Sequence, residues 1–224
     1  MSRPSLPVRH LVDPTPEQTE EAIHVMMDAF VGDSFMTTTL GRQETNPDIY
    51  YRFNRAHVLG ALVDGELWVA EDGQKIVGIA LWFLPGKGFL ETEEQRERSG
   101  MDTVTADLGE DMQGWWKDYF PPRAEGLSDA LMGPGEKLAA YYLLTLAVHP
   151  SYHNRGIGRT LMLTQAKRAW AEGKRVCWEA GNEPNVAKYE KWGGKALGDL
   201  RIDGLGGTGF TMWIMELPRP SGAA

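Results

Sequence analysis

One stretch of the chain, residues 143–161, constrains the fold more than any other. It reads LLTLAVHPSYHNRGIGRTL: an apolar run, a turn with proline, a loop with two glycines, and the start of a helix. This order places several backbone N–H groups at a helix N-terminus, where the aligned peptide dipoles favour negative charge. Gly156 and Gly158 carry no Cβ, so a bulky anion can lie against the main chain, and Arg155 and Arg159 add positive charge. The stretch predicts a site for a phosphate or pyrophosphate.

Two common phosphate loops do not fit this stretch. The dinucleotide fingerprint needs a third glycine where Leu161 stands, and the nucleotide P-loop needs a Gly-Lys-Ser/Thr sequence that the chain lacks. The segment HNRGIG from His153 to Gly158 instead resembles the acetyl-CoA loop of the GNAT superfamily of N-acetyltransferases, written [Q/R]-x-x-G-x-[G/A]. His153 departs from the pattern, because the family has Gln or Arg there.

A second motif strengthens the resemblance. Residues 179–194 read EAGNEPNVAKYEKWGG, and the family shows N-x-x-A-x-x-x-Y-x-k-x-G-F at this distance from the loop. Asn182 and Tyr189 fall on the pattern, whereas Asn185 replaces its alanine and Gly194 its phenylalanine. The resemblance covers residues 66–84 and 141–217.

Hydrophobic periodicity predicts the order of the elements. Helices are expected at 16–30, 47–62, around 107–119, at 157–172 and at 184–192, and strands at 67–72, 76–83, 140–148, 175–180, 195–202 and 209–217. This order is that of the GNAT fold, an α/β (α+β) fold with a mixed, mostly antiparallel sheet flanked by helices, whose parallel strands four and five splay apart. We expect one domain over 1–217, with an insertion at 89–136 and a flexible tail at 218–224.

Composition excludes several classes of protein. The net charge of −8 argues against a nucleic-acid partner, and no stretch approaches the roughly 18 apolar residues that span a membrane. The first residues lack the apolar core of a signal peptide, and a lone cysteine, Cys177, forms no intrachain disulfide. The five histidines have no metal-site spacing. We expect a cytoplasmic protein without a metal, either a monomer or a homodimer.

Negative charge is concentrated in one part of the predicted insertion. Residues 91–111 hold eight acidic side chains and two arginines, so they carry most of the net charge of the chain. Such a run is typical of a solvated helix face or a mobile loop. Alternatively, it forms a lid whose field attracts a cationic amine.

The resemblance implies where acetyl-CoA binds. Main-chain groups of the strand that ends at Val148 would hold the pantetheine arm, with an N–H near Ala147 and Val148 polarising the thioester carbonyl. The loop amides would hold the pyrophosphate. The implied co-substrate residues are Leu146, Ala147, Val148, His153, Asn154, Arg155, Gly156, Ile157, Gly158, Arg159, Asn182 and Tyr189.

Acetyl transfer to an amine needs an acid and a base. Tyr189, matched to the family's tyrosine, is the candidate acid; alternatively its ring only anchors the helix to the sheet. Glu179, at the end of its strand, is the first candidate base, unless it forms a structural salt bridge with Arg175 or a lysine. Asp33, Asp111 and His149 are further candidates, and a water chain could carry the proton instead.

The acceptor site is less defined by sequence. We place Asp33, Trp115, Trp116 and Tyr119 there, because an ammonium binds carboxylates and aromatic faces, although the three aromatic residues could equally pack the insertion onto the sheet. The predicted function is transfer of acetyl from acetyl-CoA to a small primary amine by direct attack in a ternary complex. The alternatives are a protein or peptide N-acetyltransferase and a catalytically inactive acyl-CoA-binding regulator.

Overall fold

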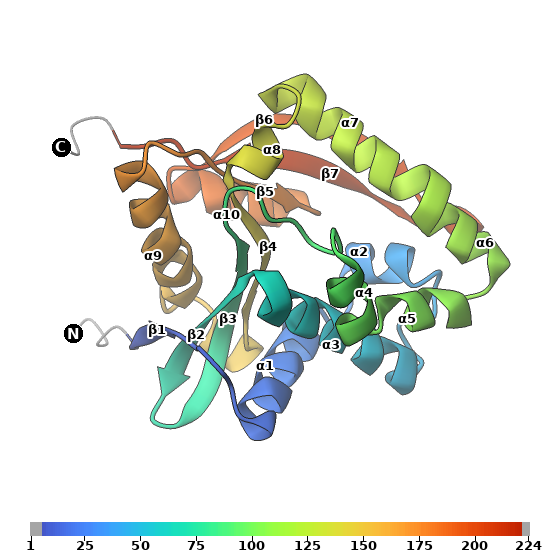
Figure 1. Cartoon of the computed structure of the whole chain (residues 1–224), viewed down its shortest axis with the longest axis horizontal. Coiled ribbons are helices and arrows are strands. Elements are labelled where there is room, and N and C mark those ends of the chain that lie inside the picture. The colour runs from blue at the N-terminus through green and yellow to red at the C-terminus, as the bar shows by residue number, and fades with distance from the viewer. Residues whose placement is uncertain (1–5, 221–224) are drawn as a thin grey trace.

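The strands of the chain form one sheet with helices on both faces, as shown by a computed structural model that describes residues 6–220 (Figure 1). Within these residues the sheet has seven strands in the order β1-β2-β3-β4-β5-β7-β6. All neighbours are antiparallel except β4 and β5, which run parallel. The strands are β1 (Val8–His10), β2 (Glu66–Asp72), β3 (Lys75–Phe83), β4 (Tyr141–Val148), β5 (Val176–Ala180), β6 (Lys195–Asp203) and β7 (Gly209–Glu216). The predicted fold class is confirmed.

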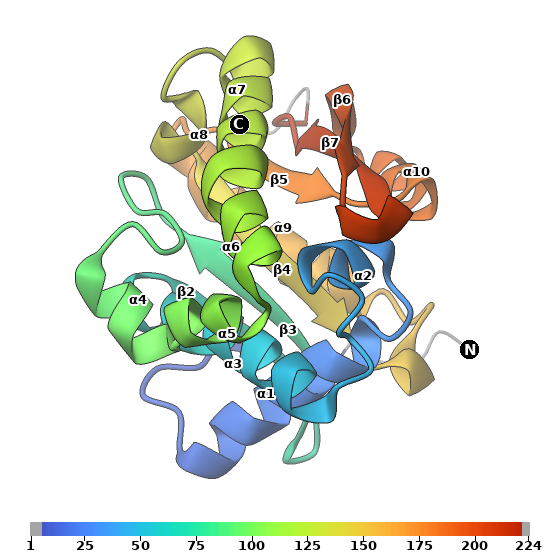
Figure 2. The same ribbon diagram turned by 90° about the vertical axis from the view of Figure 1, so that its right-hand side faces the viewer.

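Helices cover both faces of this sheet. They are α1 (Pro16–Ala29), α2 (Ser34–Thr39), α3 (Pro47–Asp64), α4 (Glu93–Ser99), α5 (Met101–Asp107), α6 (Glu110–Gly114), α7 (Phe120–Met132), α8 (Glu136–Ala139), α9 (Ile157–Ala171) and α10 (Glu183–Lys191). Helices α1 and α3 contact β3 on one face, whereas α9 packs on β3 and β4 from the other, as Figures 1 and 2 show. Helix α7 runs along β6 and β7.

Two apolar cores lie on the two sides of the sheet. The alternation of a strand sends successive side chains to opposite faces, so in β3 Ile79 and Leu81 join the core under α1 and α3, while Ala80 and Trp82 join the core under α9. All four are fully buried. Because β3 is covered on both faces, it reads as a continuous apolar run rather than an alternating one.

Local signals explain where the first helix begins. Thr15 accepts a hydrogen bond from the backbone N–H of Gln18, and the Gln18 side chain accepts one from the N–H of Thr15. This capping box satisfies two N–H groups that the first turn leaves free, and Pro16 has the φ that a first helical residue needs. The predicted helix start at Pro16 is confirmed.

The segment around 107–119 is not one helix. Helix α5 ends at Asp107, Gly109 has φ +94°, and α6 ends at Gly114. A π-helical turn over Trp115–Tyr119 then leads into α7. Two causes are visible: Gly109 adopts a conformation that interrupts a helix, and the Pro-Pro pair in the first turn of α7 has no N–H to continue the regular ladder.

Several short elements were not predicted from the sequence. Strand β1 and helix α2 are too short to show a period, and α2 is placed by its cap, the Asp33 side chain, which accepts a hydrogen bond from Phe35 N. Of the predicted tail, residues 218–220 are exposed without helix or strand, and 221–224 lie outside the described residues.

Candidate active site

Strands β4 and β5 are paired over only a short part of their length. They pair at two positions, the second of which joins Tyr142 to Cys177. Opposite β3, strand β4 has one extra residue, Leu144, between Leu143 and Thr145. Such a bulge bends the strand and increases its twist. The two strands therefore separate beyond Tyr142, and the splay implied by the family resemblance is confirmed.

Main-chain groups of β4 face the gap between these strands. The N–H of His149 donates to the carbonyl of Val77 in β3 at 2.9 Å. Hydrogen-bonding direction alternates along an antiparallel strand, so the main chain of Ala147 also pairs with β3, whereas the N–H groups of Leu146 and Val148 point into the gap. Two donors are thus available to a ligand in the splay.

The loop that follows β4 gives α9 an open N-terminus. Gly156 precedes the helix with φ +78°, and no side chain caps it. Asn154 also has positive φ, +60°. The N–H groups of a first helical turn have no partner inside the helix. The loop therefore presents them to solvent or to an anion, as its sequence predicts.

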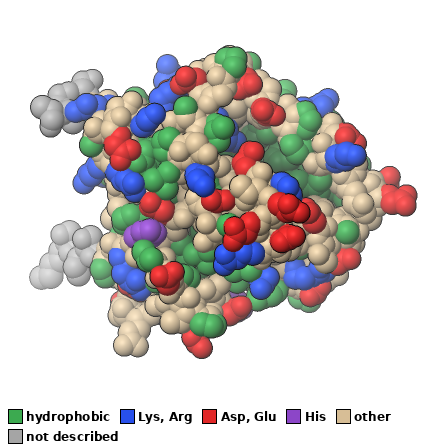
Figure 3. All heavy atoms as spheres, in the orientation of Figure 1, with side chains coloured by type: hydrophobic (Ala, Val, Ile, Leu, Met, Phe, Trp, Pro, Cys, Tyr) green, Lys and Arg blue, Asp and Glu red, His purple; other side chains and the backbone are tan. Residues whose placement is uncertain are grey.

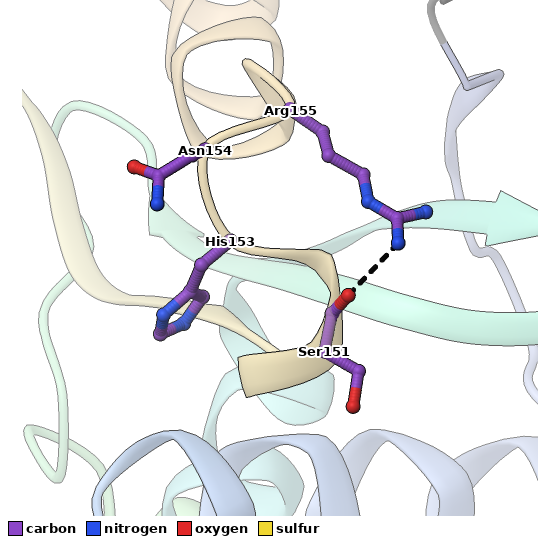
Figure 4. A pocket seen from close by; sticks show the side chains of 4 residues that line it. All are labelled: Ser151, His153, Asn154 and Arg155. Atoms are coloured by element: carbon purple, nitrogen blue, oxygen red, sulfur yellow. Dashed lines mark hydrogen bonds between the residues drawn. The ribbon is translucent and has the colours of Figure 1, made fainter.

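An open hollow of about 530 Å³ lies beside this loop, lined by Ser151, His153, Asn154 and Arg155 (Figure 4). Arg155 donates to the carbonyl of Ser151 at 2.9 Å, and its guanidinium lies 4.4 Å from the centre of the Tyr152 ring. In Figure 4, His153 and Asn154 point to the opposite side from Arg155. The Arg155 guanidinium thus lies on one side of the loop, and the His153 imidazole and the Asn154 amide lie on the other.

His153, which departs from the family pattern, has a structural bond of its own. Its Nε2 lies 2.8 Å from the carbonyl oxygen of Val148. That carbonyl points away from β3, so the imidazole ties the loop back to the end of β4. The replacement of Gln or Arg therefore keeps a side chain that can donate a hydrogen bond.

Glu179 lies on β5, two residues beyond the last position that pairs with β4. One carboxylate oxygen accepts a hydrogen bond from Lys137 Nζ at 2.6 Å and the other from the Tyr142 hydroxyl at 2.7 Å. Burial, followed by the negative charge of Glu179, raises the pKa of Tyr142 well above its usual range. Arg175 pairs with Glu216 instead. The salt bridge foreseen as an alternative role of Glu179 is present, and its partner is a lysine.

Tyr189 lies on α10, with its ring at edge-to-face angles to Trp178 and Trp192, whose ring centroids are 5.0 and 5.4 Å away. Burial raises the pKa of its hydroxyl well above the usual value. The side chain remains partly exposed, and the hydroxyl has no hydrogen-bond partner within residues 6–220. The ring therefore anchors the helix, as the alternative role predicts, and the hydroxyl is free to serve a ligand.

Asn182 and Asp33 are brought together from distant parts of the chain. Asn182 caps α10 by accepting from Asn185 N, and its Nδ2 lies 3.4 Å from Asp33 Oδ2. Burial raises the pKa of Asp33, and its hydrogen bonds offset this only in part. The loop before α2 therefore lies beside the start of α10, near the end of β5.

The three aromatic residues placed in the acceptor site have packing roles. Trp115 is buried and its Nε1 donates to the carbonyl of Asp203, while the Tyr119 hydroxyl accepts from the N–H of the same residue. Trp116 donates to the carbonyl of Thr39. These bonds fasten the segment 89–136 to β6 and α2, and a place beside an acceptor stays a prediction.

The other candidate bases have different surroundings. His149 Nδ1 accepts from Ser151 N, and its Nε2 lies 3.4 Å from Asp28 Oδ2. Asp111 is exposed on α6. Neither contacts Glu179 or Tyr142, so the structure does not bring them to the point where β4 leaves β5.

Similarity to known proteins decides the family. A model of the acetyltransferase (GNAT) family matches residues 33–194, well over half of the chain. The chain belongs to the GNAT acetyltransferase family. Among curated proteins, none matches this sequence significantly.

Solved structures show the same fold at low sequence identity. A crystal structure described as histone acetyltransferase HPA2 and related acetyltransferase, from Corynebacterium glutamicum, is 20% identical, with a TM-score of 0.61, covering 98% of this chain and 99% of that one. A polyamine N-acetyltransferase from Drosophila melanogaster is 15% identical (TM-score 0.60, coverage 96% and 100%). A mosquito arylalkylamine N-acetyltransferase-like protein is 17% identical (TM-score 0.56, coverage 96% and 100%).

One departure from the GNAT pattern has a clear compensation. A Cβ on Gly194, where the family has phenylalanine, would lie 3.2 Å from the Trp178 indole and 3.0 Å from the carbonyl of Tyr189. Trp178, almost fully buried on β5, therefore occupies space beside this position. The aromatic volume comes from the strand instead of the helix end.

Three residues of the site were missed from the sequence. The Trp192 indole packs against Gly158, where an added Cβ would lie 3.1 Å from the ring. Tyr142 could have been found, because strand alternation puts it on the same face as Leu144. Lys137 gave no local signal, since it follows an insertion.

Within residues 6–220, no helix is long and apolar enough to cross a membrane.

Proposed function

We propose that this GNAT protein transfers the acetyl group of acetyl-CoA to the primary amine of a small molecule, by direct attack while both substrates are bound. The observation that carries the proposal is the combination of a splayed β4–β5 pair with an uncapped α9 directly after β4. A ligand can reach free main-chain donors in the gap and free N–H groups at the helix in one extended pose.

The residues present fit acetyl-CoA, which supplies an activated acetyl thioester when bound. The N–H groups of Leu146 and Val148 would bond the pantetheine arm and polarise the thioester carbonyl. The first turn of α9, from Gly156 to Arg159, would hold the pyrophosphate. Apart from Gly156 itself and its two chain neighbours, nothing in residues 6–220 lies within 4 Å of the point where a Cβ would stand, and this open space supports a place for the anion there.

Glu179 and Tyr189 supply the proton transfers. Glu179 would accept the proton that an ammonium must lose before it attacks, and its link to Tyr142 fixes the carboxylate at the splay. Tyr189 would donate a proton to the departing thiolate. Its raised pKa keeps the hydroxyl protonated at neutral pH, which is the form that a proton donor needs.

The acceptor side favours a small molecule. The segment 89–136 packs over this face, where acidic side chains gather over α4 (Figure 3), and the acidic side chain of Asp33 lies at the end of β5. Negative charge at an entrance attracts a cationic amine. Two structural neighbours are described as N-acetyltransferases of polyamines and arylalkylamines. We place the protein in the cytoplasm, in keeping with its buried, free Cys177.

The proposal is tested by thiol release from acetyl-CoA across a panel of alkylamines, arylalkylamines, polyamines and lysine peptides, with thermal shifts by acetyl-CoA in parallel. We expect turnover with at least one small amine and a cofactor shift. Turnover only with peptides would assign a protein acetyltransferase. A shift without turnover on any amine would assign an acyl-CoA-binding regulator, and no shift would contradict the co-substrate site.

A further inference from the structure

The ammonium group of Lys137 lies in a small site built from two strands. Its Nζ is 2.6 Å from Glu179 Oε1 and 4.2 Å from the centre of the Tyr142 ring. A carboxylate oxygen together with an aromatic face is a common protein site for an alkylammonium ion. The two groups come from opposite sides of the splay, directly where β4 and β5 cease to pair.

The site does not depend on Lys137 for its shape. The second carboxylate oxygen of Glu179 accepts from the Tyr142 hydroxyl at 2.7 Å, so the anion and the aromatic ring position each other. Cys177, buried on the same face of β5, has a pKa raised to about 12 by burial and is a neutral neighbour. Removing the lysine would therefore leave a formed anionic pocket.

The Lys137 side chain reaches the site from a short helix and is open to solvent. It lies on α8, a four-residue helix preceded by Gly133 and Gly135, both with positive φ, and contacting β4 (Figure 1). The helix backbone is held by a hydrogen bond from Gly86 N to the carbonyl of Leu138 at 2.8 Å. The Lys137 side chain is 30% exposed and that of Glu179 20%, so solvent reaches the pair.

Charge keeps the lysine in place when nothing competes. Burial lowers the pKa of Lys137, but the charge and hydrogen bond of Glu179, with the smaller effects of Cys177 and Glu91, together raise it above its usual value. The group is therefore an ammonium at neutral pH. A second ammonium can enter only by displacing it, because two cations at one carboxylate repel each other.

We infer that Lys137 occupies the position of the acceptor's ammonium group, so that Glu179 and Tyr142 form the amine subsite and the chain's own lysine fills it until an acceptor displaces it. The inference rests on the proposed function for the identity of the site and makes it more specific. It assigns the acceptor to protonated alkylamines, and it excludes aromatic amines that are uncharged at neutral pH.

The test uses the chain without any acetyl donor. Lys137→Ala removes the atoms of an n-propylammonium ion and retains Cβ, so n-propylammonium chloride is the matched probe. We expect millimolar n-propylammonium to raise the melting temperature of Lys137→Ala by about 2–4 °C. Wild type and the double variant Lys137→Ala, Glu179→Gln should not respond, and neither n-propanol nor sodium chloride should replace the probe. An equal response in all three proteins would overturn the inference.

A second variant guards against poor folding of Lys137→Ala. Lys137→Gln keeps a long polar side chain without the competing charge. We expect it to lower the KM for an alkylamine acceptor about 3–10-fold, since displacement no longer opposes binding. An unchanged or increased KM contradicts the inference. If the protein transfers acetyl but propylammonium does not raise the melting temperature of Lys137→Ala, the inference is overturned and the proposed function stands. If the melting temperature rises but no amine is acetylated, the subsite is supported and the proposed function is overturned.

Discussion

The two sides of the β4–β5 gap offer a ligand different kinds of group, main chain on one side and side chains on the other. The α9 side uses main-chain groups from a continuous stretch of chain, from the bulge at Leu144 to Arg159. The proposed acceptor side uses side chains from separate parts of the chain: Lys137 and Tyr142 both contact Glu179, and Asp33 lies beside Asn182. Main-chain recognition survives most substitutions, whereas side-chain recognition can change with each one. Under the proposed function, this difference predicts a constant co-substrate and an acceptor specific to this chain.

The largest effect should come from filling the main-chain side. Gly156→Glu would place a carboxylate at the anion site and strain a residue with φ +78°, so we expect acetyl-CoA affinity to fall at least about 10³-fold. Isothermal titration calorimetry measures this loss. Gly173→Glu is the matched control, because it has φ +67° and equally open space at the far end of α9. Equal losses in both variants would contradict the assignment of the loop.

Removing the free hydroxyl on α10 should affect chemistry more than binding. Tyr189→Phe keeps the ring contacts with Trp178 and Trp192, so we expect kcat to fall about 10³-fold with little change in the KM for acetyl-CoA. Tyr152→Phe, which loses an exposed hydrogen bond to Asp72, is the control. Normal turnover of Tyr189→Phe would leave this tyrosine as a packing residue.

On the side-chain side, Glu179→Gln should lower kcat about 10²-fold and flatten the acidic limb of the pH–rate profile. The amide still accepts a hydrogen bond from Tyr142, so the fold should remain. Glu172→Gln, which keeps an acceptor for the Tyr141 hydroxyl, is the control. If the acidic limb is unaltered, the base lies elsewhere, and Asp33 becomes the next residue to test.

The smallest effect concerns the joint between α3 and the segment 89–136. Burial lowers the pKa of His57, which stacks on Phe89, to about 4. The unfolded chain therefore binds a proton on His57 more tightly than the folded chain does. The free energy of unfolding keeps the contribution of neutral His57 above pH 6.5 and loses it as the pH drops toward 4. We expect about 2 kcal/mol of unfolding free energy to be lost from this group by pH 5. Urea titrations above pH 6.5 and at pH 5 should show a smaller loss of unfolding free energy for His57→Phe than for wild type. Equal losses in the two proteins would contradict this.

Sequence reasoning succeeded where the signal is local. The glycine loop before α9, the start of α1 at Pro16 and the apolar run of β3 depend on neighbours within a few residues, and these elements begin near the predicted positions. It missed α2, which has only six residues. Around 107–119 the expected helical structure is present, but Gly109 and a π-helical turn interrupt its regular period. The packing roles of Trp115 and Tyr119 depend on Asp203, 88 and 84 residues away.

By itself, the sequence determined the fold class and the order of glycine loop and helix, because hydrophobic period, caps and glycine positions act over one or two turns of chain. Only the tertiary structure decided which distant side chains meet near the β4–β5 gap. Lys137 meets Glu179 across 42 residues, and Asn182 meets Asp33 across 149. No local pattern encodes such meetings, since they depend on how the sheet and its helices place distant segments side by side. The physical reason is that side chains of distant segments acquire a common environment only when the sheet register brings them together.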